Sequence, residues 1–215
     1  MNRVLQTTAF ASFSLAIAAC AGVGDANGAE PAQDDPNFAA SQEAEGATND
    51  PHEEGRHDQM DALPALPGGA DLKGTFLGTD GQENGTVSIA ETPSGLLMRV
   101  DVMGIEHGFH GVHLHETGLC EPDEGFSTAG GHANPDGVPH GALADGGPHV
   151  GDLPNAYAHQ EGHLRTDLFK AGATLADLED EDGFAVMVHS GADDYESQPS
   201  GDAGSRVACA AFPAE

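Results

Sequence analysis

The chain has 215 residues, of which 38% are hydrophobic, and its 36 acidic against seven basic side chains give a formal net charge of −29. This content suffices for one substantial core, with room for an appendage. The isoelectric point of about 4.3 argues against nucleic-acid binding, which requires clustered Lys and Arg.

Residues 1–19 predict an export signal. Arg3 precedes an uncharged, largely apolar run that ends in small side chains, and this run is too short and too rich in Ser, Thr and Ala to span a membrane. The stretch Ile17-Ala18-Ala19-Cys20-Ala21 resembles the lipobox of bacterial lipoproteins, whose cysteine is acylated after cleavage; leucine is commoner at the position of Ile17. Simple secretion after Ala16-Ile17-Ala18 is the alternative, and both place the chain outside the cytoplasm.

Residues 20–69 are expected to form a disordered acidic tether. Eleven of the 36 acids and one base, Arg56, lie in residues 21–69, where large apolar side chains are scarce. Such a segment buries too little surface to offset its ordering entropy. His52 and His57 lie among these carboxylates; we interpret them as part of a solvated tail, with metal supply to the folded part as the alternative.

From residue 70 onward the pattern changes to short strands separated by turns. Apolar and polar residues alternate over residues 86–90, 96–102 and 184–189, as in antiparallel sheets with one buried face. Only residues 171–178 suggest a helical turn. We therefore predict an all-β domain over residues 70–215, a sandwich or flattened barrel of about eight strands.

Residues 108–115 carry a pair of histidines at strand spacing. His113 and His115 share one face of the expected strand, and Val112 and Leu114 share the other. Two imidazoles about 6–7 Å apart on a strand can hold one ion between them. A lone His-x-His is weak evidence for a metal, so the interpretation depends on further ligands elsewhere in the chain.

Residues 116–157 have no sustained alternation, and a loop of this length requires something to hold it. If Cys20 is acylated, Cys120 and Cys209 remain as a pair that can form a disulfide in an exported protein. Closing this loop of about 90 residues would contribute about 2–4 kcal/mol. Two buried free thiols are the alternative.

Metal is the second candidate for holding this loop. His132, His140, His149 and Asp152 form a complete tetrahedral set for a structural zinc ion. A scatter of acids and histidines also arises by chance in an acidic chain. His189, at the end of the strand over residues 184–188, is a natural further ligand for His113 and His115, and four nitrogens suit copper.

Several dispersed segments resemble the copper/zinc superoxide dismutases, over roughly residues 70–215. They are residues 108–115, Gly130-Gly131-His132-Ala133-Asn134-Pro135, His140-Gly141, residues 149–154, Met187-Val188-His189 and residues 204–209. Cys120-Glu121-Pro122 and the run before His132 are similar to the bacterial envelope members. The resemblance implies an immunoglobulin-like Greek-key sandwich that converts superoxide to oxygen and hydrogen peroxide by alternating Cu(II) and Cu(I).

The resemblance also implies residue roles. The copper ligands would be His113, His115, His132 and His189, and the zinc ligands His132, His140, His149 and Asp152, so that His132 bridges both ions. Arg206 matches the arginine beside copper, Asp193 the carboxylate behind one ligand of each metal, and Cys120 and Cys209 the disulfide. His110 matches a position that is not a ligand, and packing or backbone bonding is expected for it.

The expected small-molecule partner is superoxide. The chain is expected to be a monomer or a homodimer. No nucleic acid is expected, and contact with a membrane only through a lipid on Cys20, in a bacterial envelope or periplasm. Residues 190–204 correspond to the loop that shapes anion approach in the family, and here they contain four acids and no lysine. A copper-binding or delivery protein of the same fold is the principal alternative, and a purely structural envelope module a weaker one.

Overall fold

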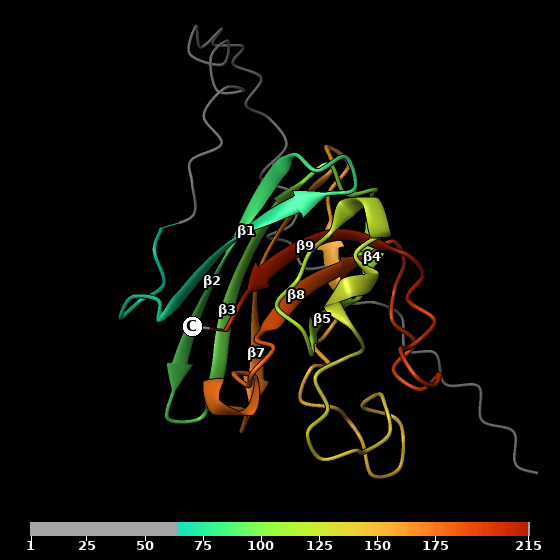
Figure 1. The fold of residues 1–215 in the computed structure, drawn as a ribbon. Helices are drawn as coiled ribbons and strands as arrows, with labels where there is room; N and C mark the ends of the chain where they lie inside the picture. Colours follow the sequence, from blue (N-terminus) through green and yellow to red (C-terminus); the bar gives the residue numbers. More distant parts are fainter. Residues whose placement is uncertain (1–63, 215) are drawn as a thin grey trace, which may run out of the picture. The chain divides into compact units, whose positions relative to one another are not determined.

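The computed structural model describes residues 64–214 (Figure 1). The expected export signal and most of the expected tether, with Cys20, His52 and His57, lie outside the described residues. Within the described range, no helix has the length and apolar character needed to cross a membrane.

The strands form one antiparallel sheet, with the order β4-β6-β7-β3-β2-β1-β9-β8-β5. Their bounds are β1 Leu72–Gly78, β2 Glu83–Thr92, β3 Gly95–Met103, β4 Gly108–His110, β5 Val112–His115, β6 Ala156–Ala158, β7 His163–Ala171, β8 Phe184–His189 and β9 Arg206–Phe212. The two ends of the order, β4 and β5, are consecutive in the chain. The sheet therefore curls into a nearly closed barrel, which confirms the all-β Greek-key prediction.

The segment expected as a single strand over residues 108–115 is divided at Gly111, which gives nine strands in place of about eight. Gly111 donates to the carbonyl of Gly191 and accepts from the N–H of His189. A Cβ at this position would lie 3.0 Å from side-chain atoms of both Ala203 and His113. The chain thus changes its pairing partner here, from β6 to β8, at a point too crowded for a side chain.

Three short 3-10 helices complete the regular structure of the described residues: η2 Pro122–Glu124, η3 Ser127–Ala129 and η4 Leu175–Asp177. The last falls within residues 171–178, where the sequence suggests a helical turn. A capping box between Thr174 and Asp177 caps the N-terminus of η4.

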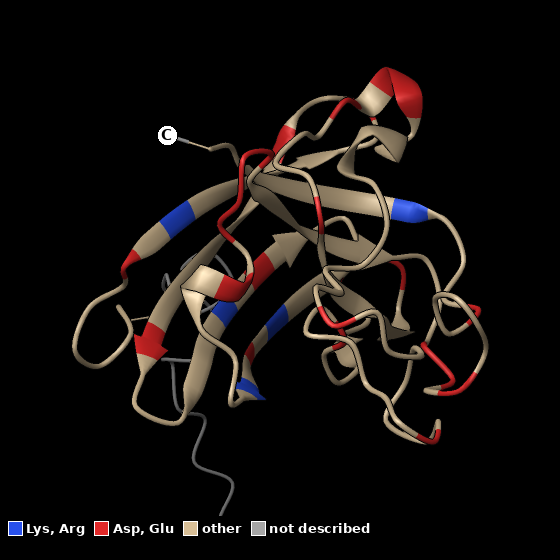
Figure 2. Cartoon of the chain, turned by 60° about the horizontal axis from the view of Figure 1, so that its bottom comes forward, with Lys and Arg blue, Asp and Glu red and all other residues tan. Residues whose placement is uncertain are grey.

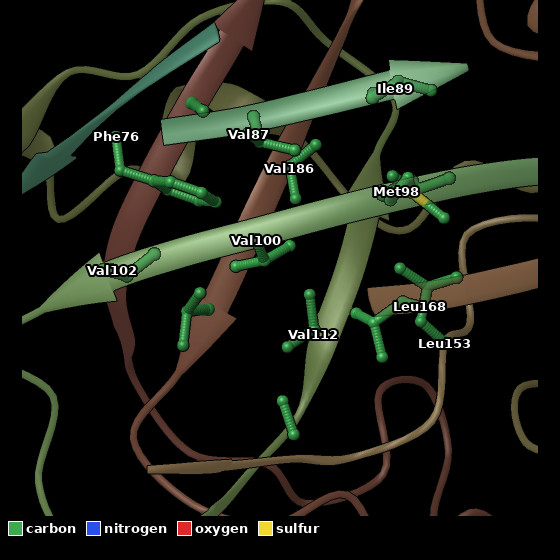
Figure 3. Packing of buried hydrophobic residues seen from close by; sticks show 14 of the residues in the cluster. Phe76, Val87, Ile89, Met98, Val100, Val102, Val112, Leu153, Leu168 and Val186 are labelled. Carbon is green, nitrogen blue, oxygen red and sulfur yellow. The ribbon is translucent and has the colours of Figure 1, made fainter. Parts of the chain in front are cut away.

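The core fills the barrel with the alternate residues that the strand patterns place inward (Figure 3). Strand β3 buries Leu96, Met98, Val100 and Val102 on one face, while the intervening residues are partly exposed. Every second residue of β8, beginning with Phe184, faces the same core. Alternation therefore predicts the inward face correctly.

A second, smaller cluster covers the opposite face of β8. It comprises Phe126, Ala129, Ala185, Met187 and Cys209, all buried. Cys120 is joined to Cys209 by a disulfide, which confirms the expected pair. The loop that follows β5 is thereby attached to the last strand of the barrel.

The charges are distributed unevenly. All five Lys and Arg residues of the described chain lie on strands, whereas many of the acids lie in loops and turns (Figure 2). The loops at the mouth of the site described below therefore carry acidic and neutral side chains.

Candidate metal centre

Strand β5 presents His113 and His115 on the face opposite to Val112 and Leu114, as strand alternation predicts. Val112 and Leu114 pack into the barrel core, and both histidines are buried. β8 pairs with β5 and ends at His189, where a register shift between Val188 and His189 interrupts the ladder with β9. Bulges of this kind redirect a side chain.

The long loop uses the edge of β5 that β8 leaves open. Isolated bridges pair His113 with Asp152 and His115 with His132. Leu114 donates its N–H to Gly151, and its carbonyl accepts from the N–H of Ala133. Backbone pairing thus brings two separate segments of the loop beside the histidine pair, and each segment carries a further ligand group.

The first cluster, here called the four-histidine set, consists of His113, His115, His132 and His189. Their ligand atoms lie within 4.8 Å of one another. In each ring one nitrogen is buried without a hydrogen-bond partner: Nδ1 of His113 and Nε2 of His115, His132 and His189. Buried polar atoms are rarely left unpaired, so four unpaired nitrogens around one point fit a metal ion.

The other nitrogen of each ring has a partner that fixes the ring's orientation. His115 donates from Nδ1 to the carbonyl of Gly130 at 3.0 Å, and His189 from Nδ1 to that of Gly204 at 3.3 Å. His113 donates from Nε2 to the carboxylate of Asp193 at 2.7 Å. In these three rings, the backbone carbonyls and Asp193 therefore decide which nitrogen is left free to face the ion.

The second cluster, here called the histidine–aspartate set, consists of His132, His140, His149 and Asp152. Asp152 Oδ1 lies 2.8 Å from Nδ1 of His132, 2.8 Å from Nδ1 of His140 and 3.2 Å from Nδ1 of His149. Donors bound at about 2.0 Å to a tetrahedral ion lie about 3.3 Å apart. Three imidazole nitrogens around one carboxylate oxygen therefore fit a closed zinc site.

His132 belongs to both clusters. Its Nδ1 faces Asp152, and its Nε2 faces the four-histidine set. The His132 ring lies 4.0 Å from that of His113 and 5.1 Å from that of His140, between centroids. One imidazole therefore separates two adjacent ion sites.

The protonation states suit metal binding. Burial lowers the pKa of His113 to about 4, of His115 to about 2 and of His189 to about 3. Burial opposes the ionisation of Asp152, but hydrogen bonds from His132 and from backbone N–H groups hold its pKa below the usual range. At neutral pH His113, His115 and His189 thus offer uncharged nitrogens, and Asp152 offers a carboxylate.

Asp193 lies behind both clusters. Its carboxylate accepts from Nε2 of His113 at 2.7 Å and from Nε2 of His140 at 3.1 Å. Burial alone would raise the pKa of Asp193, but these bonds and the N–H of Tyr195 hold it at about 2. One carboxylate therefore orients one ring of each set.

Arg206 begins β9 directly opposite His189 in the ladder. Its guanidinium donates to the carbonyls of Phe126 and Gly130, and the side chain is half-buried. Burial lowers the pKa of Arg206, yet a guanidinium stays charged at physiological pH. The loop anchored by the disulfide therefore holds a fixed cation beside the four-histidine set.

Residues 83–212 match the family model described as copper/zinc superoxide dismutase. The chain is 40% identical over 140 residues to superoxide dismutase [Cu-Zn] 2 of Aquifex aeolicus, covering 62% of this chain and 81% of that protein. It is 37% identical over 139 residues to superoxide dismutase [Cu-Zn] of Caulobacter vibrioides, covering 60% and 78%.

Solved structures with a similar fold carry related names. A SOD-like protein from Bacillus subtilis superposes with a TM-score of 0.61 at 31% identity, covering 65% of this chain and 96% of that one. The Cu/Zn superoxide dismutase from Brucella abortus gives a TM-score of 0.56 at 31% identity, covering 65% and 97%.

This chain belongs to the copper/zinc superoxide dismutase family. Copper and zinc are the metals of this family, and the two buried clusters fit them, with four nitrogens for copper and a closed tetrahedral set for zinc. The structure brings together every residue that the family resemblance implies as a ligand.

His110 is not a member of either cluster of this dismutase fold. It is buried, and its ring nitrogens lie 2.7 Å from the carbonyl of His189 and 2.6 Å from that of Glu106. The expectation of backbone bonding for His110 is confirmed.

Three residues that support the centre have no signal in the sequence. Lys170 on β7 donates to the backbone carbonyls of His149 and Asp152. Asn155 donates its backbone N–H to the hydroxyl of Tyr195, and its side-chain amide exchanges hydrogen bonds with the backbone of Asp193. Lys170, Asn155 and Tyr195 lie outside the ligand motifs, and only the fold brings them to the centre.

Proposed function

We propose that this chain catalyses the dismutation of two superoxide anions and two protons to oxygen and hydrogen peroxide. In this proposal the four-histidine set holds copper and the histidine–aspartate set holds zinc. The observation that carries it is the double membership of His132, whose two nitrogens face different clusters. A metal-binding module without turnover has no need of such a shared ring.

Copper, when bound, supplies one-electron exchange between Cu(II) and Cu(I). The chain's own residues supply the rest. Arg206 binds and orients the superoxide anion, because its guanidinium is held rigidly by two backbone carbonyls. The cation also favours the anion over neutral molecules of similar size.

His132 supplies a proton. Its Nδ1 is committed to the histidine–aspartate set, so that Nε2 is the one nitrogen of this ring able to gain and release a proton. Donation from Nε2 supplies one of the two protons that the peroxide takes up as it forms. Asp193 and the carbonyls behind His115 and His189 keep the surrounding rings in place during this exchange.

Metal analysis of the purified full-length chain, combined with a superoxide-consumption assay, tests the proposal. We expect one copper and one zinc per chain and consumption of superoxide that depends on copper. Both metals bound without turnover would favour the copper-delivery alternative, although no ligand implied by the family resemblance is missing here and Arg206 is present. A folded chain that binds neither metal would favour a structural module.

We also propose that the chain resides in a bacterial cell envelope, attached through a lipid on Cys20. The support is the sequence of residues 1–21. Cys20→Ser should move the protein from the membrane to the soluble fraction without loss of its metals. Equal membrane association of this variant and the wild type would contradict the lipid anchor.

A further inference from the structure

Lys170, on β7, contacts the backbone of two residues in the histidine–aspartate set. Its Nζ donates to the carbonyl of His149 at 2.5 Å and to the carbonyl of Asp152 at 3.1 Å. The side chain is half-buried, and burial lowers its pKa while the charge of Asp152 acts in the opposite direction. One ammonium thus joins both ends of the turn over residues 149–152.

The same turn is fixed from the side that faces the cluster. Oδ2 of Asp152 accepts from the backbone N–H of Gly141 at 2.8 Å and of His149 at 2.9 Å. These bonds leave Oδ1 facing the imidazoles. Lys170 holds the outer side of the turn, so the positions of both ligand-bearing residues are fixed from two directions.

The choice of partners by Lys170 is unusual for so acidic a chain. Among the described residues, no carboxylate oxygen lies within 4.0 Å of its Nζ. By contrast, Arg99 pairs with Asp167 and Arg165 pairs with Asp101. Residues 70–215 contain 25 acids, yet Lys170 donates to two backbone carbonyls. Its role is therefore to hold the backbone of residues 149–152 in place.

We propose that Lys170 is a positioning residue for zinc: by fixing the carbonyls of His149 and Asp152, it holds Nδ1 of His149 and Oδ1 of Asp152 at coordination distance before the ion binds. This inference rests on the proposed assignment of the histidine–aspartate set to zinc. No ligand atom is contributed by Lys170 itself.

The positive charge of Lys170 and its positioning role have opposite effects on zinc affinity, so an experiment can separate them. A cation near the site repels a divalent ion, so removal of Lys170 would strengthen zinc binding if charge were the larger effect. Removal would weaken zinc binding if positioning is the larger effect. The sign of the change therefore separates the two.

The experiment is a zinc titration of the metal-free, full-length chain in competition with a chelator of known affinity. Lys170→Met keeps the unbranched apolar stem, one atom shorter, but loses the donors and the charge. We expect its zinc affinity to fall about tenfold or more, as for other groups that orient ligands. Lys170→Arg, which keeps the charge and two or more donors, should remain within about threefold of the wild type. Lys73→Met, which removes an exposed base on β1, is the matched control and should change nothing.

Cobalt(II) serves as a second, spectroscopic probe of the same site. Its visible absorption reports tetrahedral coordination, and we expect a weaker or shifted band in Lys170→Met but not in Lys73→Met. A role in general stability alone would lower the melting temperature of the metal-free chain and leave zinc affinity and this band unchanged. If Lys170→Met fails to fold, Lys170→Gln replaces it, because the shorter amide cannot reach both carbonyls.

Zinc affinity of Lys170→Met or Lys170→Gln equal to or tighter than that of the wild type would overturn the inference. A different result would contradict the proposed function. A wild-type chain that binds zinc but does not consume superoxide contradicts the activity, and the effect of Lys170 on zinc affinity is measured independently of turnover.

Discussion

Nε2 of His113 lies 2.7 Å from Oδ2 of Asp193, and both side chains are buried. The same carboxylate accepts from His140, so a single acid links the two clusters through rings that point their remaining nitrogens in different directions. An acid in this position controls ligand orientation without binding a metal.

Asp193→Asn should therefore weaken the binding of both metals. An amide has one acceptor oxygen, and its NH₂ group would oppose the N–H of one of the two rings. We expect copper and zinc affinities to fall about 10–100-fold, as measured by chelator competition. Asp194→Asn is the control, because Asp194 is exposed and its carboxylate accepts hydrogen bonds from Glu196 and Ser197 in the loop, away from both clusters. Equal losses in both variants would refute the role of Asp193.

Arg206→Glu should sharply reduce turnover with copper still bound. The change replaces the cation that faces the anion with a negative charge, and a loss of about 100-fold is expected by comparison with other anion-stabilising donors. Superoxide consumption is measured on samples of verified copper content. Arg206→Lys keeps the charge but not the two-carbonyl anchorage, so its loss should be smaller; unchanged activity in Arg206→Glu would exclude a role for Arg206 in the reaction.

The dependence of the rate on salt should be weak or inverted. Residues 70–215 carry 25 acids and five bases, a net charge of −20, and residues 190–204 contain exposed Asp194, Glu196 and Asp202 without a lysine. Salt screens the resulting repulsion of an anionic substrate as the Debye length shortens from about 30 Å at 0.01 M to about 8 Å at 0.15 M. Rates measured across this range should fall little or rise. A steep fall would mean that the local field at the site is attractive.

Asp101 should make stability depend on pH in the acid range. Burial opposes its ionisation, but hydrogen bonds from His163 and Arg165 outweigh burial and lower its pKa from 3.8. A carboxyl group with a lowered folded-state pKa stabilises the fold above the unfolded-state value, and this contribution disappears as pH falls through the folded-state value.

Asp101→Asn should accordingly lower the free energy of unfolding of the metal-free chain by about 1 kcal/mol at pH 7. The difference from the wild type should begin to shrink below about pH 4, near the unfolded-state pKa of an Asp. It should vanish once the pH is below the lowered folded-state pKa of Asp101, where both chains are uncharged at this position. Urea unfolding at several pH values measures it. Asp80→Asn, in the turn between β1 and β2, is the control, and a pH-independent difference in Asp101→Asn would show that its charge is not the cause.

The sequence alone determines the features that depend on local periodicity. Alternation predicts the buried face of β3 and β8, and it places His113 and His115 together on the outer face of β5, because successive side chains on a strand point to opposite sides. The resemblance to the family adds the fold, the disulfide between Cys120 and Cys209, and the ligand set. The assignment of each metal to its ligands stays a prediction.

Only the tertiary structure decides how the irregular loop meets the barrel. Bridges from His132 and Asp152 to the open edge of β5, and the contact of Lys170 with the carbonyls of His149 and Asp152, join residues far apart in the chain. No periodic pattern encodes such contacts, because they depend on which strand edge remains unpaired once the sheet has closed. The division of the strand at Gly111 has the same origin, since the barrel closes there.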